Sequence, residues 1–192
     1  PQSHSDAIRR VLTAAKRGTK VYYLIGNHDE VLRKYLSYDI SLGRIKILDR
    51  YNYISLTGHK YLVIHGDQFD SLMMPSRKWI MHVGDFCYNI LVWMNTHLNG
   101  IRTLMGLEYW SLSHFLKSRT KSALNFISSY ENHVAEYCET HSYDGVICGH
   151  IHTPTIKQIG NVTYMNDGDF CDSCSALVED AKTGEFKLIE YK

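Results

Sequence analysis

Apolar and polar positions repeat along this chain with two different periods. Residues 6–17 carry apolar side chains at helical spacing and are followed by Gly18, which is typical of a helix end. Directly afterwards, residues 20–25 (KVYYLI) form a β-branched and aromatic run that stops at Gly26, and this predicts a buried strand. A helix followed at once by a buried strand is typical of the α/β class.

Further short strands are predicted in two groups, separated by a long stretch of helical spacing. Residues 71–140 form that stretch and contain no clear strand pattern. We therefore predict a single α/β domain over residues 1–192, interrupted by a helical insert at 71–140. The predicted strands lie at 45–48, 51–56, 61–64, 146–148, 155–159, 162–165, 176–178 and 186–189.

Composition excludes several classes of protein. Hydrophobic residues make up 44% of the 192 positions and charged residues 21%, which excludes a disordered chain, and the net charge of +1 gives no bias toward nucleic acid. No apolar run is long enough for a membrane span. Five cysteines, an odd number, predict reduced thiols and a cytoplasmic protein, with Cys171 and Cys174 as ordinary strand-edge residues. The chain begins at Pro1 without Met, so we expect a processed or cropped sequence.

Histidine is the unusual residue, with 11 copies, and it occurs in three motifs that each follow a predicted strand. These motifs are 26–29 (GNHD), 65–67 (HGD) and 149–152 (GHIH). Open α/β sheets bind ligands at the carboxyl ends of their strands, so we expect the three loops to lie together. Glycine lets the backbone turn sharply in each of them.

The side chains of these motifs suit a transition metal. His150 and His152 are two residues apart, and an extended segment would point both imidazoles the same way. Asn27 offers an amide oxygen and His65 a third imidazole. A donor set of nitrogen and oxygen suits Mn, Fe, Zn or Co rather than Ca.

With these motifs, the chain resembles the calcineurin-like metallophosphoesterases, whose pattern closes with G-N-H-[DE], a His and G-H-x-H. Within that superfamily the similarity is greatest to the UDP-2,3-diacylglucosamine diphosphatase group. The resemblance implies a calcineurin-like two-sheet sandwich flanked by helices (αββα), with a helical insert. The stretches that carry it are 1–4 (PQSH), 26–30 (GNHDE), 65–67 (HGD), 149–153 (GHIHT) and 164–174 (YMNDGDFCDSC).

The resemblance also implies a centre of two divalent metal ions, Mn first and Fe, Zn or Co as alternatives. Asn27, His65 and His150 would bind one metal and His152 the other. The family's D-x-H and G-D-x-x-D motifs, which supply its acidic ligands, are absent. We expect them upstream of Pro1, and we expect that the chain as given cannot hold a complete two-metal site.

Two further residues have implied roles in catalysis. His28 would steady the charge on a phosphoryl oxygen or protonate the leaving group, and Asp29 would orient His28. A plain turn or helix-cap role for Asp29 is nearly as well supported, and Asp67 is ambiguous in the same way.

For the substrate, the resemblance implies cleavage of the pyrophosphate of UDP-2,3-diacylglucosamine to a lipid monophosphate and UMP, a step of lipid A biosynthesis. Residues 71–121 hold six basic and two acidic residues and all three tryptophans, which suits peripheral contact with an anionic lipid head group or a bilayer surface. The resemblance implies that this region is a helical lid that receives acyl chains at the inner membrane face. Core packing is the alternative for this region. Lys117, Arg119 and Lys121 could meet substrate phosphates or form a solvated helix face. A phosphodiesterase of soluble nucleotides and an inactive interaction module remain alternative functions.

Overall fold

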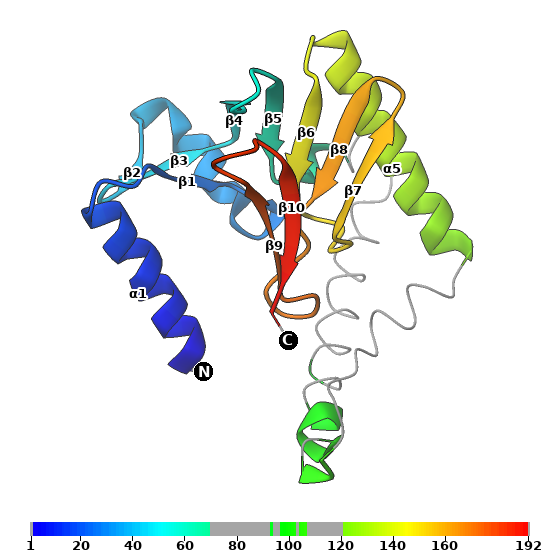
Figure 1. Cartoon of the computed structure of the whole chain (residues 1–192). Coiled ribbons are helices and arrows are strands. Elements are labelled where there is room, and N and C mark those ends of the chain that lie inside the picture. The colour runs from blue at the N-terminus through cyan, green and yellow to red at the C-terminus, as the bar shows by residue number, and fades with distance from the viewer. Residues whose placement is uncertain (1, 70–92, 94–96, 103, 107–120, 192) are drawn as a thin grey trace.

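The centre of the molecule is a five-stranded mixed sheet (Figure 1). The computed structural model describes residues 2–69, 93, 97–102, 104–106 and 121–191. Strands β5 (Lys60–Ile64), β6 (Gly145–Cys148) and β8 (Val162–Asn166) run parallel, so their carboxyl ends lie at the same edge of the sheet. The strand order is β4 (Arg50–Ile54), β5, β6, β8 and β7 (Thr155–Ile159).

Helix α5 (Lys121–Thr140) packs on one face of this sheet. Its residues Tyr130, Val134 and Cys138 are four apart, fall on one side of the helix and are fully buried. They join the inward-facing side chains of the strands, among them Leu62 and Tyr164, in one core cluster. Full burial of each large apolar side chain stabilises the fold by about 1.5–3 kcal/mol, so this layer anchors β5, β6 and β8.

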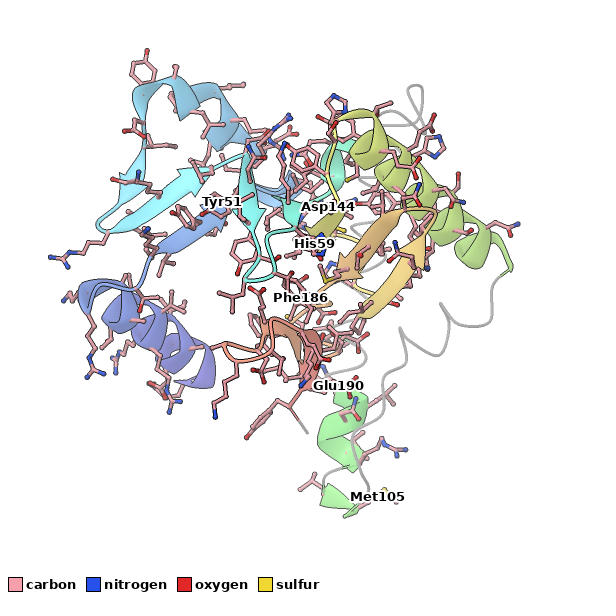
Figure 2. All side chains as sticks on the ribbon, turned by 45° about the horizontal axis from the view of Figure 1, so that its top comes forward. Tyr51, His59, Met105, Asp144, Phe186 and Glu190 are labelled. Carbon is pink, nitrogen blue, oxygen red and sulfur yellow. The ribbon has the colours of Figure 1, made fainter. Side chains whose placement is uncertain are left out.

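A hairpin of β9 (Ser175–Glu179) and β10 (Phe186–Glu190) packs against the face of the central sheet opposite to α5. Phe186, labelled in Figure 2, meets Tyr61 edge to face with ring centroids 5.1 Å apart and Tyr53 at 6.5 Å. Since Tyr61 and Leu62 are neighbours on β5, they face opposite sides of the sheet. The central sheet therefore has a helix on one side and a hairpin on the other.

A second sheet has the order β1 (Val21–Leu24), β3 (Ile45–Leu48) and β2 (Ser41–Leu42), with β1 parallel to β3. Tyr22 of β1 stacks on Tyr51 of β4 with centroids 4.3 Å apart, which ties the two sheets together. Helix α1 (Gln2–Lys16) precedes β1, and two 3₁₀ segments, η1 (Asn27–Tyr38) and η2 (Asp67–Phe69), follow β1 and β5.

The mixed α/β fold is confirmed, and every strand expected from the sequence is present within two residues of its predicted ends. Of the proposed helical insert at 71–140, the last 20 residues form α5 and pack into the core. Lys117, Arg119 and the side chain of Lys121 lie outside the described residues, and the insert as a unit stays a prediction. None of the described helices is both long and apolar enough to cross a bilayer.

Candidate functional site

The three histidine motifs meet where β1, β5 and β6 end. The rings of His65 and His150 lie side by side with centroids 5.1 Å apart. The backbone N–H of Gly149 donates to the carbonyl of His65 at 3.1 Å, which joins the two loops. Gly26 packs against the His65 ring so closely that a Cβ there would lie 2.7 Å from Nε2. The loop that carries Asn27 can approach His65 only because residue 26 has no side chain.

The G-H-I-H segment is not extended, and this corrects the expectation for His150 and His152. Both residues have positive φ, 66° and 50°, in the left-handed region that non-glycine residues rarely adopt. Ile151 between them is 8% exposed and belongs to the core cluster. Inserting Ile151 into the core requires the chain to turn at both histidines. Such backbone strain costs on the order of 1–3 kcal/mol per residue and is typical of functional sites.

Two of the histidines face a carboxylate. Nδ1 of His65 lies 3.0 Å from Oδ1 of Asp67, and Nδ1 of His152 lies 3.2 Å from Oδ2 of Asp169. Burial alone would raise the pKa of Asp67, but contacts with His65 and Arg33 outweigh it and hold this pKa well below its usual range. A carboxylate behind a histidine is the arrangement that orients metal-binding imidazoles.

Asp169 was not recognised in the sequence. Burial would raise its pKa too, but contact with His152 and the backbone N–H groups of Asp172 and Cys171 lower it to about 2. Its position three residues after β8 was the available signal, because β8 ends at the same edge as β5 and β6.

Asp167 is a second carboxylate that sequence analysis missed. Its backbone N–H donates to the carbonyl of Cys148 at 3.1 Å, and its Oδ1 lies 3.2 Å from the point where a Cβ on Gly149 would be. The carboxylate interacts electrostatically with both His152 and His65. It brings negative charge to an edge whose expected metal-binding side chains are all neutral.

No hydrogen bond joins the side chains of Asp29 and His28, both of which the structure describes. Oδ1 of Asp29 accepts the backbone N–H of Gly26 at 3.0 Å, so this carboxylate caps the start of η1. The ring of His28 is exposed and makes no hydrogen bond to any described residue. The geometry gives Asp29 the cap role that the sequence left open, and the catalytic roles of both residues stay predictions.

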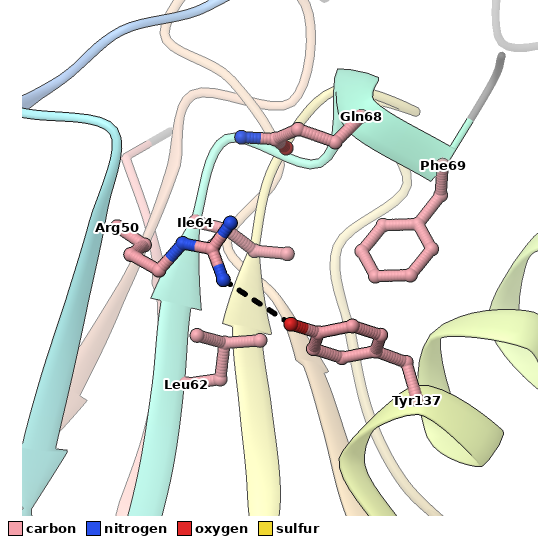
Figure 3. Close-up of a pocket in the computed structure, with 6 residues that line it drawn as sticks. All are labelled: Arg50, Leu62, Ile64, Gln68, Phe69 and Tyr137. Atoms are coloured by element: carbon pink, nitrogen blue, oxygen red, sulfur yellow. Dashed lines mark hydrogen bonds between the residues drawn. The ribbon is translucent and has the colours of Figure 1, made fainter. Parts of the chain in front are cut away.

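A small cavity lies behind the HGD loop, between the central sheet and α5 (Figure 3). Leu62, Ile64 and Phe69 line it, with Gln68 and with Arg50, whose Nη1 donates to the hydroxyl of Tyr137 at 3.1 Å. Its volume of about 90 Å³ is well below the roughly 300–1,000 Å³ of common ligand pockets. We do not assign it to substrate binding.

The donor chemistry of the edge fits a divalent transition metal, since the rings of His65 and His150 lie side by side there and the loops of Asn27 and His152 meet them. Within the described part of the chain, no three His, Cys, Asp or Glu side chains converge closely enough to hold an ion. The described residues therefore supply suitable donors without closing a ligand shell.

The family model for calcineurin-like phosphoesterases matches residues 2–154. A search of curated proteins gave no match. Among solved structures, a chain from the work "Structural and Functional Characterization of a Novel Archaeal Phosphodiesterase" is 14% identical with a TM-score of 0.44. The match covers 94% of this chain and 74% of that one.

Proposed function

The chain belongs to the calcineurin-like phosphoesterases, and on this premise we propose that the edge formed by the GNHD, HGD and GHIH loops is its catalytic centre. The family hydrolyses phosphoester bonds and generally uses two divalent metal ions. One observation carries the proposal: loops from three distant parts of the sequence meet, with the His65 and His150 rings 5.1 Å apart.

In this proposal Asn27, His65 and His150 hold one metal ion and His152 the other. When bound, divalent ions polarise the phosphoryl oxygens and lower the pKa of bound water. Mn is the first candidate, with Fe, Zn and Co as alternatives, because imidazole and amide oxygen suit all four.

The chain's own side chains orient these groups and move protons. Asp67 accepts a hydrogen bond from Nδ1 of His65, and Asp169 lies 3.2 Å from Nδ1 of His152, so Nε2 of each ring is directed away from its carboxylate. The exposed ring of His28, next to Asn27, donates a hydrogen bond to a phosphoryl oxygen or a proton to the leaving group.

The proposed substrate is UDP-2,3-diacylglucosamine, whose P–O–P bond takes up water to give a lipid monophosphate and UMP. Similarity of the stretches 26–30, 149–153 and 164–174 to that group of diphosphatases supports this choice. The basic and tryptophan-rich residues 71–121 support contact with the lipid at the cytoplasmic face of the inner membrane, with Lys117, Arg119 and Lys121 near the substrate phosphates.

The test is hydrolysis by the 192-residue chain with and without added Mn²⁺. UDP-2,3-diacylglucosamine and bis(4-nitrophenyl) phosphate serve as substrates. Because the described residues do not close a ligand shell, we expect at most weak metal-dependent turnover, which His65→Ala and His150→Ala abolish and His28→Ala lowers by about 10²–10⁴-fold. His133→Ala, an exposed position on α5, is the matched control and should have no effect.

Each outcome bears on a separate part of the proposal. Turnover of the diester alone would overturn the lipid substrate and leave the centre in place. Turnover that persists in His65→Ala and His150→Ala would overturn the centre itself. A folded chain that binds none of the four metals and hydrolyses neither substrate would favour an interaction module.

A further inference from the structure

Arg33 joins three segments next to the candidate centre through a single guanidinium group. Its Nε donates to Oδ1 of Asp49 at 2.7 Å, and its Nη2 donates to the carbonyl of Ile25 at 3.0 Å. Nη1 also donates to Oδ2 of Asp67 at 2.7 Å, and Nη2 donates to Oδ1 of the same carboxylate at 2.8 Å. The planar fork of arginine matches a carboxylate in this two-point geometry, which the point charge of lysine cannot reproduce.

Asp67 links Arg33 to His65, because its carboxylate contacts both side chains. The side chain of Asp67 is only 8% exposed, and its Oδ1 receives both Nη2 of Arg33 and Nδ1 of His65. An ionised carboxylate can only accept hydrogen bonds, so Nδ1 of His65 must carry the proton. The lone pair of the ring is then on Nε2, the atom that packs against Gly26 beside Asn27.

We propose that Arg33 is a positioning residue that fixes the tautomer and orientation of His65 through Asp67. Arg33 touches no expected metal-binding side chain, and its link to the ring of His65 runs through the carboxylate of Asp67. The consequence for metal binding rests on the proposed function, whereas the tautomer of His65 does not. A purely structural ion pair would stabilise the fold without setting which ring nitrogen carries the proton.

The variants separate these two roles. Arg33→Met removes the fork, Arg33→Lys keeps a charge without it, and Asp67→Ala removes the acceptor. Lys157→Met is the matched control, because it breaks a different cation–carboxylate pair, with the nearly buried Glu131, between β7 and α5. All are made in the full 192-residue chain, together with the double variant of Arg33→Met and Asp67→Ala.

The primary readout is the ¹⁵N spectrum of the His65 imidazole at pH 8, above the usual histidine pKa. We expect a single Nδ1–H form in the unmodified chain and in Lys157→Met, and a mixture of both tautomers in the Arg33 and Asp67 variants. If Arg33→Met does not fold, the same spectrum of Arg33→Lys tests the proposal. A folded Arg33 variant with an unchanged Nδ1–H form would overturn the proposal.

The second readout is Mn²⁺ affinity by calorimetry. Loss of a residue that supports a metal-binding histidine typically weakens affinity 10–100-fold, which we expect for Arg33→Met and for Asp67→Ala. The double variant should be no weaker than Asp67→Ala, because both changes act along one path. Additive losses would contradict action through Asp67. If the unmodified chain binds no Mn²⁺, the proposed function fails, and the imidazole spectrum still decides the role of Arg33.

Discussion

At the scale of single residues, the candidate centre is defined as much by carboxylates as by histidines. His65 and His152 each have an acidic partner, and Asp167 interacts with both rings. Asp67 belongs to the HGD motif itself, whereas Asp167 and Asp169 lie in a different loop from the histidines, so the histidine motifs gave no sign of these two. Histidines held by carboxylates have one tautomer and one orientation, which prepares them to bind a metal.

Replacing Asp169 by Asn tests one of these pairs through the pH dependence of stability. The pKa of Asp169 in the fold is about 2, below its usual 3.8, so its contribution is complete above pH 4 and is lost as the pH falls through 2. We expect Asp169→Asn to lower the free energy of unfolding by roughly 2 kcal/mol at pH 7, and the difference to shrink below pH 4. Denaturant titrations from pH 7 to pH 2 measure it.

The control for this prediction is Asp6→Asn, whose side chain on α1 is half-exposed and which should lower the free energy of unfolding far less than Asp169→Asn does. A difference for Asp169→Asn that stays constant down to pH 2 would contradict the assigned pairing with His152.

At the scale of elements, the centre depends on the tight turn that follows β5. Gly66 has φ of +116°, and its carbonyl accepts the hydroxyl of Tyr130 from α5 at 3.0 Å. A Cβ at this position would overlap that hydroxyl and approach Cβ of His150 at 3.3 Å. Helix, turn and the G-H-I-H loop are therefore packed as one unit, and the position of α5 fixes the spacing of His65 and His150.

Gly66→Ala should disrupt this unit. We expect a loss of at least about 1–3 kcal/mol from the positive φ alone, with a further loss from the clash with Tyr130. Tyr130→Phe removes the overlapping oxygen, so the same glycine change should cost less in that background. Thermal or denaturant unfolding of the four chains measures this coupling. Equal losses in both backgrounds would show that the hydroxyl of Tyr130 does not restrict residue 66.

At the scale of the whole molecule, the apolar pattern predicted the architecture and not the contacts across it. The strands at 45–48 and 155–159 were placed correctly to the residue, because β-branched runs bounded by turns have a clear pattern. Strand β2 was missed because its two residues are exposed, and η1 because it buries no residue and so has no apolar stripe. Arg33 and Asp67 are 34 residues apart, and no local pattern connects them.

The central claim is that the edge where β1, β5 and β6 end is a metal centre. Calorimetric titration of the 192-residue chain with Mn²⁺ tests it most directly, beside His65→Ala, His152→Ala and the control His133→Ala. We predict binding by the unmodified and control chains, weakened about 10-fold or more in the other two. No binding of Mn²⁺, Zn²⁺ or Co²⁺, or equal affinity in all four chains, would contradict the account.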